Sequence, residues 1–224
     1  MRYLIVIPAY NAADTIAELI HRIQKIMPGA GILVVDDGSS DGTGALAQNA
    51  GADVLTHNPN RGKGEALKTA FAEALKRDVD VVIQLDADLQ HDPKYLPDLA
   101  QQFVATGNDI IIGTRDFNVG GMPWDRHFTN WLTSYAITKM GGVKVEDSQS
   151  GYRLLSHKAI QTVNAPSSNY DYESEYLILA GRAGLTIGKV PISTIYEGQK
   201  SSIKKWTDTK RFLRLVKKYW SSRP

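Results

Sequence analysis

Apolar residues in the first half of the chain follow two alternating spacings. A continuous apolar run at Tyr3–Ile7 has the length of a strand. Apolar residues then recur every three or four positions from Ile16 to Met27, which predicts an amphipathic helix. The same alternation continues and predicts strands at 32–35, 53–55, 80–85 and 109–114 and helices at 43–50, 65–76 and 124–140.

Strands that alternate with helices and are apolar on both faces are typical of a mostly parallel sheet covered by helices on both sides. The sequence therefore predicts an α/β fold with such a central sheet. At 224 residues, the chain is long enough for one domain with a short appendage.

The net charge of +2 conceals two unlike parts. Residues 1–198, the predicted domain, carry more acidic than basic side chains, whereas residues 199–224 carry nine basic side chains against a single acid, Asp208. Aromatic residues such as Trp206 and Trp220 lie among these cations, which indicates a basic amphipathic segment that binds a membrane surface. The alternative is an ordinary terminal helix that packs Leu215, Val216 and Trp220 on the core. Nucleic acid is not expected as a partner, because the rest of the chain is acidic.

Two absences narrow the chemistry. The sequence has no cysteine, so any metal must be held by oxygen or imidazole. No apolar run reaches the roughly 18 residues that cross a bilayer, and no signal peptide precedes the first strand. We expect a cytoplasmic protein.

Ligands of open α/β sheets bind at the carboxyl ends of the strands, and polar loops follow the predicted strands here. Asp86 and Asp88 lie two positions apart where a strand ends, so their carboxylates can converge on one cation. Mg²⁺ or Mn²⁺ prefers such oxygen ligands, and Gln90 lies within reach of the same site. The alternative is that both aspartates only form a turn.

Two further loops suit a nucleotide. Residues 36–42 are small and acidic, which allows a base and ribose to approach, although an Asx turn with a helix cap explains the same residues. Residues 60–64 place glycines and Lys63 at a helix start, which favours an anionic ligand. The spacing does not match a P-loop.

Together these motifs resemble the family-two inverting glycosyltransferases of GT-A fold, most closely the dolichyl- or polyprenyl-phosphate mannosyltransferase group. The resemblance covers nearly the whole chain in the family's order. It departs at Ala12, where the family often has Glu. The matching residues are 8–11, 36–39 with 41–43, 60–64, 86–91 with Pro93, 113–115, Asp147 with 150–153, and Pro191 with Tyr196.

The resemblance implies the donor-binding residues for a GDP- or UDP-hexose. Pro8, Tyr10 and Asp37 would contact the base and ribose, and Asn11 and Lys63 belong to the same donor-binding set. Asp86 would lie at the ribose or the metal, and Asp88 with Gln90 at the metal on the diphosphate.

The resemblance also implies an acceptor side. A phosphate monoester is largely dianionic at neutral pH and needs cations rather than a base. Arg115, and Arg126 with Asn130 one helical turn later, would therefore hold a polyprenyl phosphate. The alternative is that Arg126 is a solvated residue paired with Asp125. Asp147 would be the catalytic base for a rival saccharide-hydroxyl acceptor, or it would anchor its loop or pair with Arg153. Glu173 and Glu175 are expected only to favour a helix start.

The predicted function is transfer of mannose or glucose from GDP or UDP to polyprenyl phosphate. The enzyme would be peripheral at the inner membrane face, with the basic tail or a membrane-protein partner bringing it to the lipid. The alternatives are transfer to a saccharide hydroxyl in cell-surface polysaccharide synthesis, and a nucleotide-sugar-binding subunit without catalysis.

Overall fold

The computed structural model describes residues 1–115, 124–193 and 205–222, without the side chains of 124–128 and 205–208. Within these ranges, seven strands form one sheet in the order β3-β2-β1-β4-β6-β5-β7. Of these seven strands, only β6 is antiparallel to its neighbours. The predicted mostly parallel α/β sheet is confirmed. The strands are β1 (Tyr3–Ala9), β2 (Gly31–Asp36), β3 (Asp53–Thr56), β4 (Val81–Gln84), β5 (Ile110–Arg115), β6 (Arg153–Ser156) and β7 (Ile187–Ile192).

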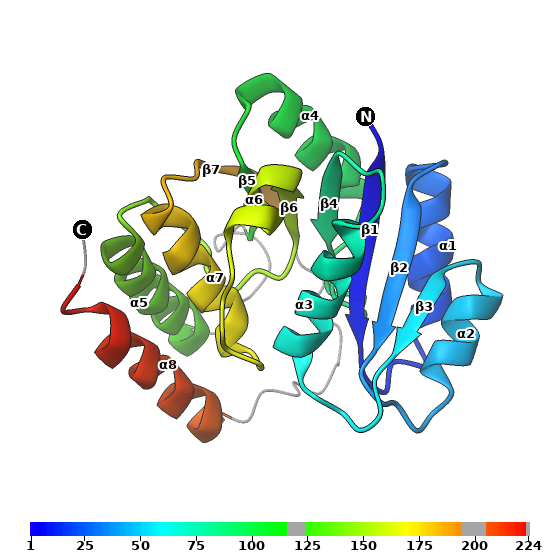
Figure 1. Cartoon of the computed structure of the whole chain (residues 1–224), viewed down its shortest axis with the longest axis horizontal. Coiled ribbons are helices and arrows are strands. Elements are labelled where there is room, and N and C mark those ends of the chain that lie inside the picture. The colour runs from blue at the N-terminus through cyan, green and yellow to red at the C-terminus, as the bar shows by residue number, and fades with distance from the viewer. Residues whose placement is uncertain (116–123, 194–204, 223–224) are drawn as a thin grey trace.

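Helices cover both faces of the sheet (Figure 1). Alternate strand residues serve two cores: Leu4 of β1 packs on one side and Ile5 on the other. The first core includes residues of α3, α5, α6, α7 and α8, and the second residues of α1, α2 and α4. The helices are α1 (Ile16–Ile26), α2 (Thr43–Asn49), α3 (Lys63–Ala74), α4 (Leu96–Thr106), α5 (Trp124–Gly141), α6 (His157–Thr162), α7 (Asp171–Arg182) and α8 (Lys205–Tyr219), with a short 3-10 turn at Pro93–Tyr95.

The predicted elements of the first 141 residues all exist, each within two residues of the predicted bounds. The sequence pattern missed α4, α6, β6 and β7. Strand β6 inserts antiparallel between β4 and β5. Leu154 and Leu155 are its only apolar residues, so no apolar run of strand length revealed it.

This topology decides where the site lies. Parallel strands β1 to β5 end at one edge of the sheet, and antiparallel β6 begins there. In register, Arg153 at the start of β6 lies beside Gln84 of β4 and Ile112 of β5. Residues 148–151, which precede β6, therefore join the loops that follow the parallel strands.

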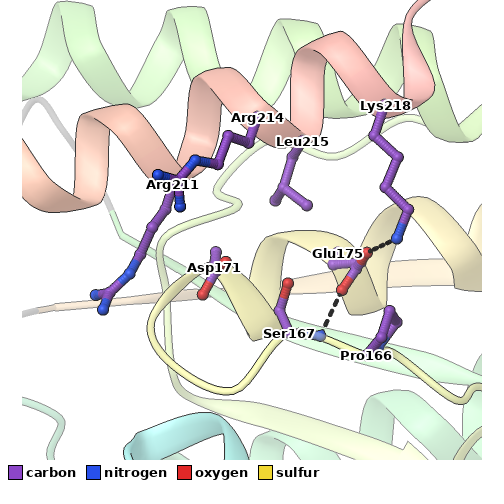
Figure 2. A pocket seen from close by; sticks show the side chains of 8 residues that line it. All are labelled: Pro166, Ser167, Asp171, Glu175, Arg211, Arg214, Leu215 and Lys218. Carbon is purple, nitrogen blue, oxygen red and sulfur yellow. Dashed lines mark hydrogen bonds and ion pairs between the residues drawn. The ribbon is translucent and has the colours of Figure 1, made fainter.

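Helix α8 packs on the domain. Leu215 and Tyr219 are buried, and Figure 2 shows Lys218 reaching across a pocket to Glu175 of α7, at 2.9 Å. The predicted packing of Leu215 is confirmed, whereas Trp220 stays 38% exposed. The predicted boundary at 198 lies outside the described residues. Within the described ranges, the helices are all too short or too polar to span a membrane.

Candidate functional site

The first two polar loops bind each other. The backbone N–H of Asn11 donates to Ser39 Oγ at 2.9 Å, and Asn11 Oδ1 accepts from Ser40 N at 3.0 Å. Asn11 has a φ of 49°, a left-handed conformation that Asn tolerates better than most residues. Beside it, Pro8 is half-buried and Tyr10 is 56% exposed, so Tyr10 is available to a ligand.

Asp37 organises the third loop. Its buried carboxylate accepts hydrogen bonds from the backbone N–H groups of Arg61 at 2.9 Å and Gly62 at 2.7 Å. His57 Nδ1 lies 2.7 Å from the same carboxylate. These contacts hold the start of α3, and with it Lys63, against the end of β2. The predicted contact of Asp37 with a base or ribose stays a prediction.

Lys63 joins the third loop to the fourth. Its ammonium Nζ lies 2.7 Å from Asp86 Oδ1 and 2.9 Å from Glu173 Oε2. Glu173 Oε1 in turn accepts from Gln84 Nε2 at 2.6 Å. The sequence predicted for Glu173 only a role at a helix start, yet the structure brings its carboxylate from α7 to Lys63 and Gln84.

Packing allows little freedom around Asp86. A Cβ atom on Gly151 would overlap the Asp86 carboxylate, with Cγ only 2.8 Å away. Any side chain at position 151 would therefore displace Asp86. Nearby, Asp88 Oδ1 accepts from the Gln90 backbone N–H at 3.0 Å, and Leu89 between them has a φ of 58°. A left-handed Leu is uncommon and is a strained turn of the kind found at functional sites.

The electrostatics of this cluster favour a cation. Burial opposes the charge on Lys63, but Asp86 and Glu173 outweigh it and raise the Lys63 pKa. Burial, followed by the negative charge of Asp86, raises the pKa of Asp88. A carboxylate with a raised pKa gains from a nearby positive charge.

Asp86, Asp88 and Gln90 therefore fit a hard divalent cation, and the Lys63 ammonium already marks one cationic position. Among the residues that the structure describes, no group of three His, Cys, Asp or Glu side chains is arranged to hold a metal ion. Phosphate oxygens and water would have to complete the coordination. Metal binding by these residues stays a prediction.

His91 directly follows Gln90 in the sequence and is buried. The centroid of its ring lies 5.7 Å from that of the Tyr152 ring. Its Nδ1 has no hydrogen-bond partner among the described residues. Burial lowers the pKa of His91 to about 4, and the opposing charge of Asp86 offsets only part of the effect.

This pKa predicts a pH-dependent stability. Between pH 6.5 and 4 the unfolded chain binds a proton at His91 that the folded chain does not, so stability falls as pH falls. From pH 7 to pH 5 the loss is about 2 kcal/mol. Urea unfolding of the metal-free protein at both pH values measures it. His91→Phe should remove this part of the loss, and an equal loss in the variant would contradict the prediction.

On the far side of β4, Arg115 and Asp147 form a bidentate ion pair. Arg115 Nε and Nη2 each donate to one Asp147 oxygen at 2.8 Å. The Arg115 backbone N–H adds a third bond to the same carboxylate, at 3.1 Å. The Asp147 side chain is fully buried and that of Arg115 is 16% exposed. Despite burial, the bonds from Arg115 lower the pKa of Asp147.

This pair changes the interpretation of both residues. A general base must be accessible to the acceptor, whereas the carboxylate of Asp147 is fully buried and both its oxygens accept bonds from Arg115. The suggested partner Arg153 instead donates to the backbone carbonyls of Ser148, Ser150 and Glu173. Asp147 therefore holds the Arg115 guanidinium in place, whereas the predicted catalytic roles of both residues stay predictions.

The other predicted acceptor residues lie on α5. Asn130 is buried, and its Oδ1 lacks a hydrogen-bond partner in the described part of the chain. Arg126 belongs to the first turn of the same helix, but its side chain lies outside the described residues. The structure thus brings one of the two predicted phosphate-binding arginines, Arg115, to the site edge.

Glucosyl-3-phosphoglycerate synthase of Mycobacterium tuberculosis, solved with Mn²⁺ and UDP-glucose, superimposes with a TM-score of 0.75. The match covers 100% of this chain and 80% of that one at 22% identity. The protein therefore has the GT-A fold of that structure.

The chain belongs to glycosyl transferase family 2, whose family description matches residues 4–163. An undecaprenyl-phosphate mannosyltransferase of Micrococcus luteus is 32% identical over 206 residues, 87% of this chain and 84% of that protein. A UDP-N-acetylglucosamine–dolichyl-phosphate N-acetylglucosaminyltransferase of Methanococcus voltae is 30% identical over 214 residues, 86% of this chain and 85% of that protein.

Proposed function

We propose that this glycosyltransferase moves a hexose, mannose or glucose, from a GDP- or UDP-sugar to a polyprenyl phosphate with inversion at the anomeric carbon. The observation that carries the acceptor class is the Arg115–Asp147 pair. It leaves a fixed guanidinium, and no accessible Asp147 carboxylate, on the acceptor side. The relatives named for undecaprenyl and dolichyl phosphate support the same acceptor class.

On the donor side, we assign Asp86, Asp88 and Gln90 to a Mg²⁺ or Mn²⁺ ion. When bound, such an ion would stabilise the negative charge that develops on the departing nucleoside diphosphate. Lys63, held by Glu173 at 2.9 Å, supplies a second positive charge at the start of α3, where backbone N–H groups also favour phosphate. Tyr10, exposed in the loop that follows β1, is available to the nucleotide's base.

On the acceptor side, the phosphate monoester is already a dianionic nucleophile at neutral pH, so no proton has to be removed. The chain needs only to attract and orient it. Asp147 fixes the plane of the Arg115 guanidinium through two 2.8 Å bonds, and we assign the second cation to Arg126. Enzyme and lipid would meet at the inner face of the membrane.

The test is transfer of radiolabel from a panel of GDP- and UDP-hexoses to polyprenyl phosphate in detergent, with Mn²⁺ or with EDTA. We expect label in the lipid fraction with one donor, and loss of that label in EDTA. If the donor is consumed and the label appears only in an added saccharide, the acceptor is a saccharide hydroxyl and the proposed lipid acceptor is wrong. Donor binding without any turnover would point to a non-catalytic subunit.

A further inference from the structure

Helix α5 exposes a cluster of large apolar side chains on its outer face. Trp131 is 56% exposed, Leu132 48% and Tyr135 48%. The opposite face of the same helix carries Ile137 and Met140, both fully buried. A helix at a protein surface normally presents polar residues to water, and adjacent exposed apolar residues mark an interaction surface. We call Trp131, Leu132 and Tyr135 the α5 ledge.

The ledge has the chemistry of a membrane interface. The Trp131 and Tyr135 rings stack with centroids 5.9 Å apart and an interplanar angle of 18°. Lys139 Nζ lies 5.6 Å from the centroid of the Tyr135 ring, one turn further along. Trp and Tyr concentrate where lipid headgroups meet acyl chains, and a neighbouring Lys suits an anionic headgroup.

Helix α8 extends this surface. Arg182 ties the two helices together by donating to the Met140 carbonyl of α5 at 2.9 Å and the Tyr219 carbonyl of α8 at 2.8 Å. Figure 1 shows α5 and α8 beside each other at the end of the molecule remote from β3. The exposed residues of α8 include the basic Lys210, Arg214 and Lys217 and the apolar Leu213, together with the uncharged Thr209. Trp220, which directly follows the helix, is exposed as well.

The same turns of α5 contact the acceptor side of the site. Ser134 Oγ accepts from the Ser148 backbone N–H at 2.9 Å, and Gln149 Nε2 donates to Thr133 Oγ1 at 3.3 Å. Ser148 directly follows Asp147, the partner of Arg115. A bilayer on the outer face of α5 would thus lie about one helix diameter, 10 Å, from the loop that orients Arg115.

We propose that the α5 ledge, with the basic outer face of α8 beside it, docks on an anionic lipid bilayer. Docking brings the phosphate of a membrane-embedded acceptor to Arg115. This inference rests on the proposed function for its purpose, but the surface can be tested without it. In this proposal the main apolar contact with the bilayer is made by α5, and not by the C-terminal segment as the sequence predicted.

The test compares two triple variants of the full chain. The ledge variant is Trp131→Gln, Leu132→Gln and Tyr135→Gln. The matched control replaces three exposed apolar residues elsewhere, Leu46→Gln, Leu75→Gln and Val104→Gln, of which Val104 is 64% exposed. Both are measured by sedimentation with vesicles of equal parts phosphatidylcholine and phosphatidylglycerol, and with phosphatidylcholine alone.

We expect the wild type and the control to bind the anionic vesicles alike, and the ledge variant to bind about tenfold or more weakly. Equal binding by all three proteins would overturn the inference, as would a wild type that forms dimers and ignores vesicles. Circular dichroism establishes that each variant is folded.

Activity separates this inference from the proposed function. The ledge variant should lose transfer to long-chain polyprenyl phosphate in vesicles and keep transfer to a water-soluble short isoprenyl phosphate. If no protein transfers to either acceptor from any donor, the proposed function fails while the vesicle result still decides the surface. If the variant keeps full activity on vesicles, the ledge does not serve the acceptor.

Discussion

Substitution of Asp88 by Asn is expected to lower the rate of hexose transfer by about 10²- to 10³-fold, the usual effect of removing one group that stabilises transition-state charge. The variant removes one carboxylate of the predicted metal site but preserves its volume. Asn can still accept the 3.0 Å bond from the Gln90 backbone. Because burial and Asp86 raise the Asp88 pKa, losing the charge should not lower the stability of the metal-free protein.

Three measurements test this prediction. They are the initial rate at saturating donor, Mn²⁺ binding followed by electron paramagnetic resonance, and thermal unfolding in EDTA. Asp92→Asn is the matched control, because Asp92 is nearby but caps the turn at Lys94 through a 3.0 Å bond that Asn can also accept. The control should keep its rate and its Mn²⁺ affinity. Unchanged Mn²⁺ binding by Asp88→Asn would remove Asp88 from the metal site.

Asp147→Asn is expected to reduce the free energy of unfolding by about 3 to 5 kcal/mol, because it removes the buried carboxylate that binds the mostly buried Arg115 guanidinium in two places. The sign follows from the lowered pKa of Asp147. The charged carboxylate stabilises the fold above its unfolded pKa of about 3.9, and the contribution is lost as pH falls through the folded pKa.

Urea unfolding at pH 7 measures the change. The neighbouring Glu146→Gln is the control: Glu146 is 33% exposed and pairs with the exposed Lys144 and Lys189, so its loss should cost less than about 1 kcal/mol. The double variant Asp147→Leu with Arg115→Met should be more stable than either single variant, since it removes both charges. An Asp147→Asn enzyme of normal stability but greatly reduced transfer would restore Asp147 as a catalytic base.

Much of the fold was predictable because it depends on local pattern. Apolar runs of strand length alternate with helical spacings up to Gly141, and each predicted element formed. Successive side chains of β1 point to opposite faces of the sheet, and each face packs against its own core. This is why β1 is apolar on both faces. The antiparallel insertion of β6 was not predictable, because its four residues pair with strands distant in the sequence.

The residues of the candidate site likewise include some that the sequence pattern revealed and some that it did not. The loops that contain Asp37, Lys63, Asp86 and Asp88 were found because each directly follows a strand. Glu173 was missed because its helix lies 89 positions after Gln84, its hydrogen-bond partner. Gly151 belongs to the family motif at 150–153, but only the structure gives the reason for a glycine there, which is the Asp86 carboxylate that it faces.

By itself the sequence determined the α/β class, the edge at which chemistry gathers and the acidic pair Asp86 and Asp88, because these follow from local periodicity and loop position. Tertiary structure alone decided the partners of those charges. It paired Arg115 with Asp147, two residues that the sequence had assigned to rival acceptors, and set Lys63 between Asp86 and Glu173. The physical reason is that an ion pair requires atoms within a few ångström, and only the strand order brings these segments together.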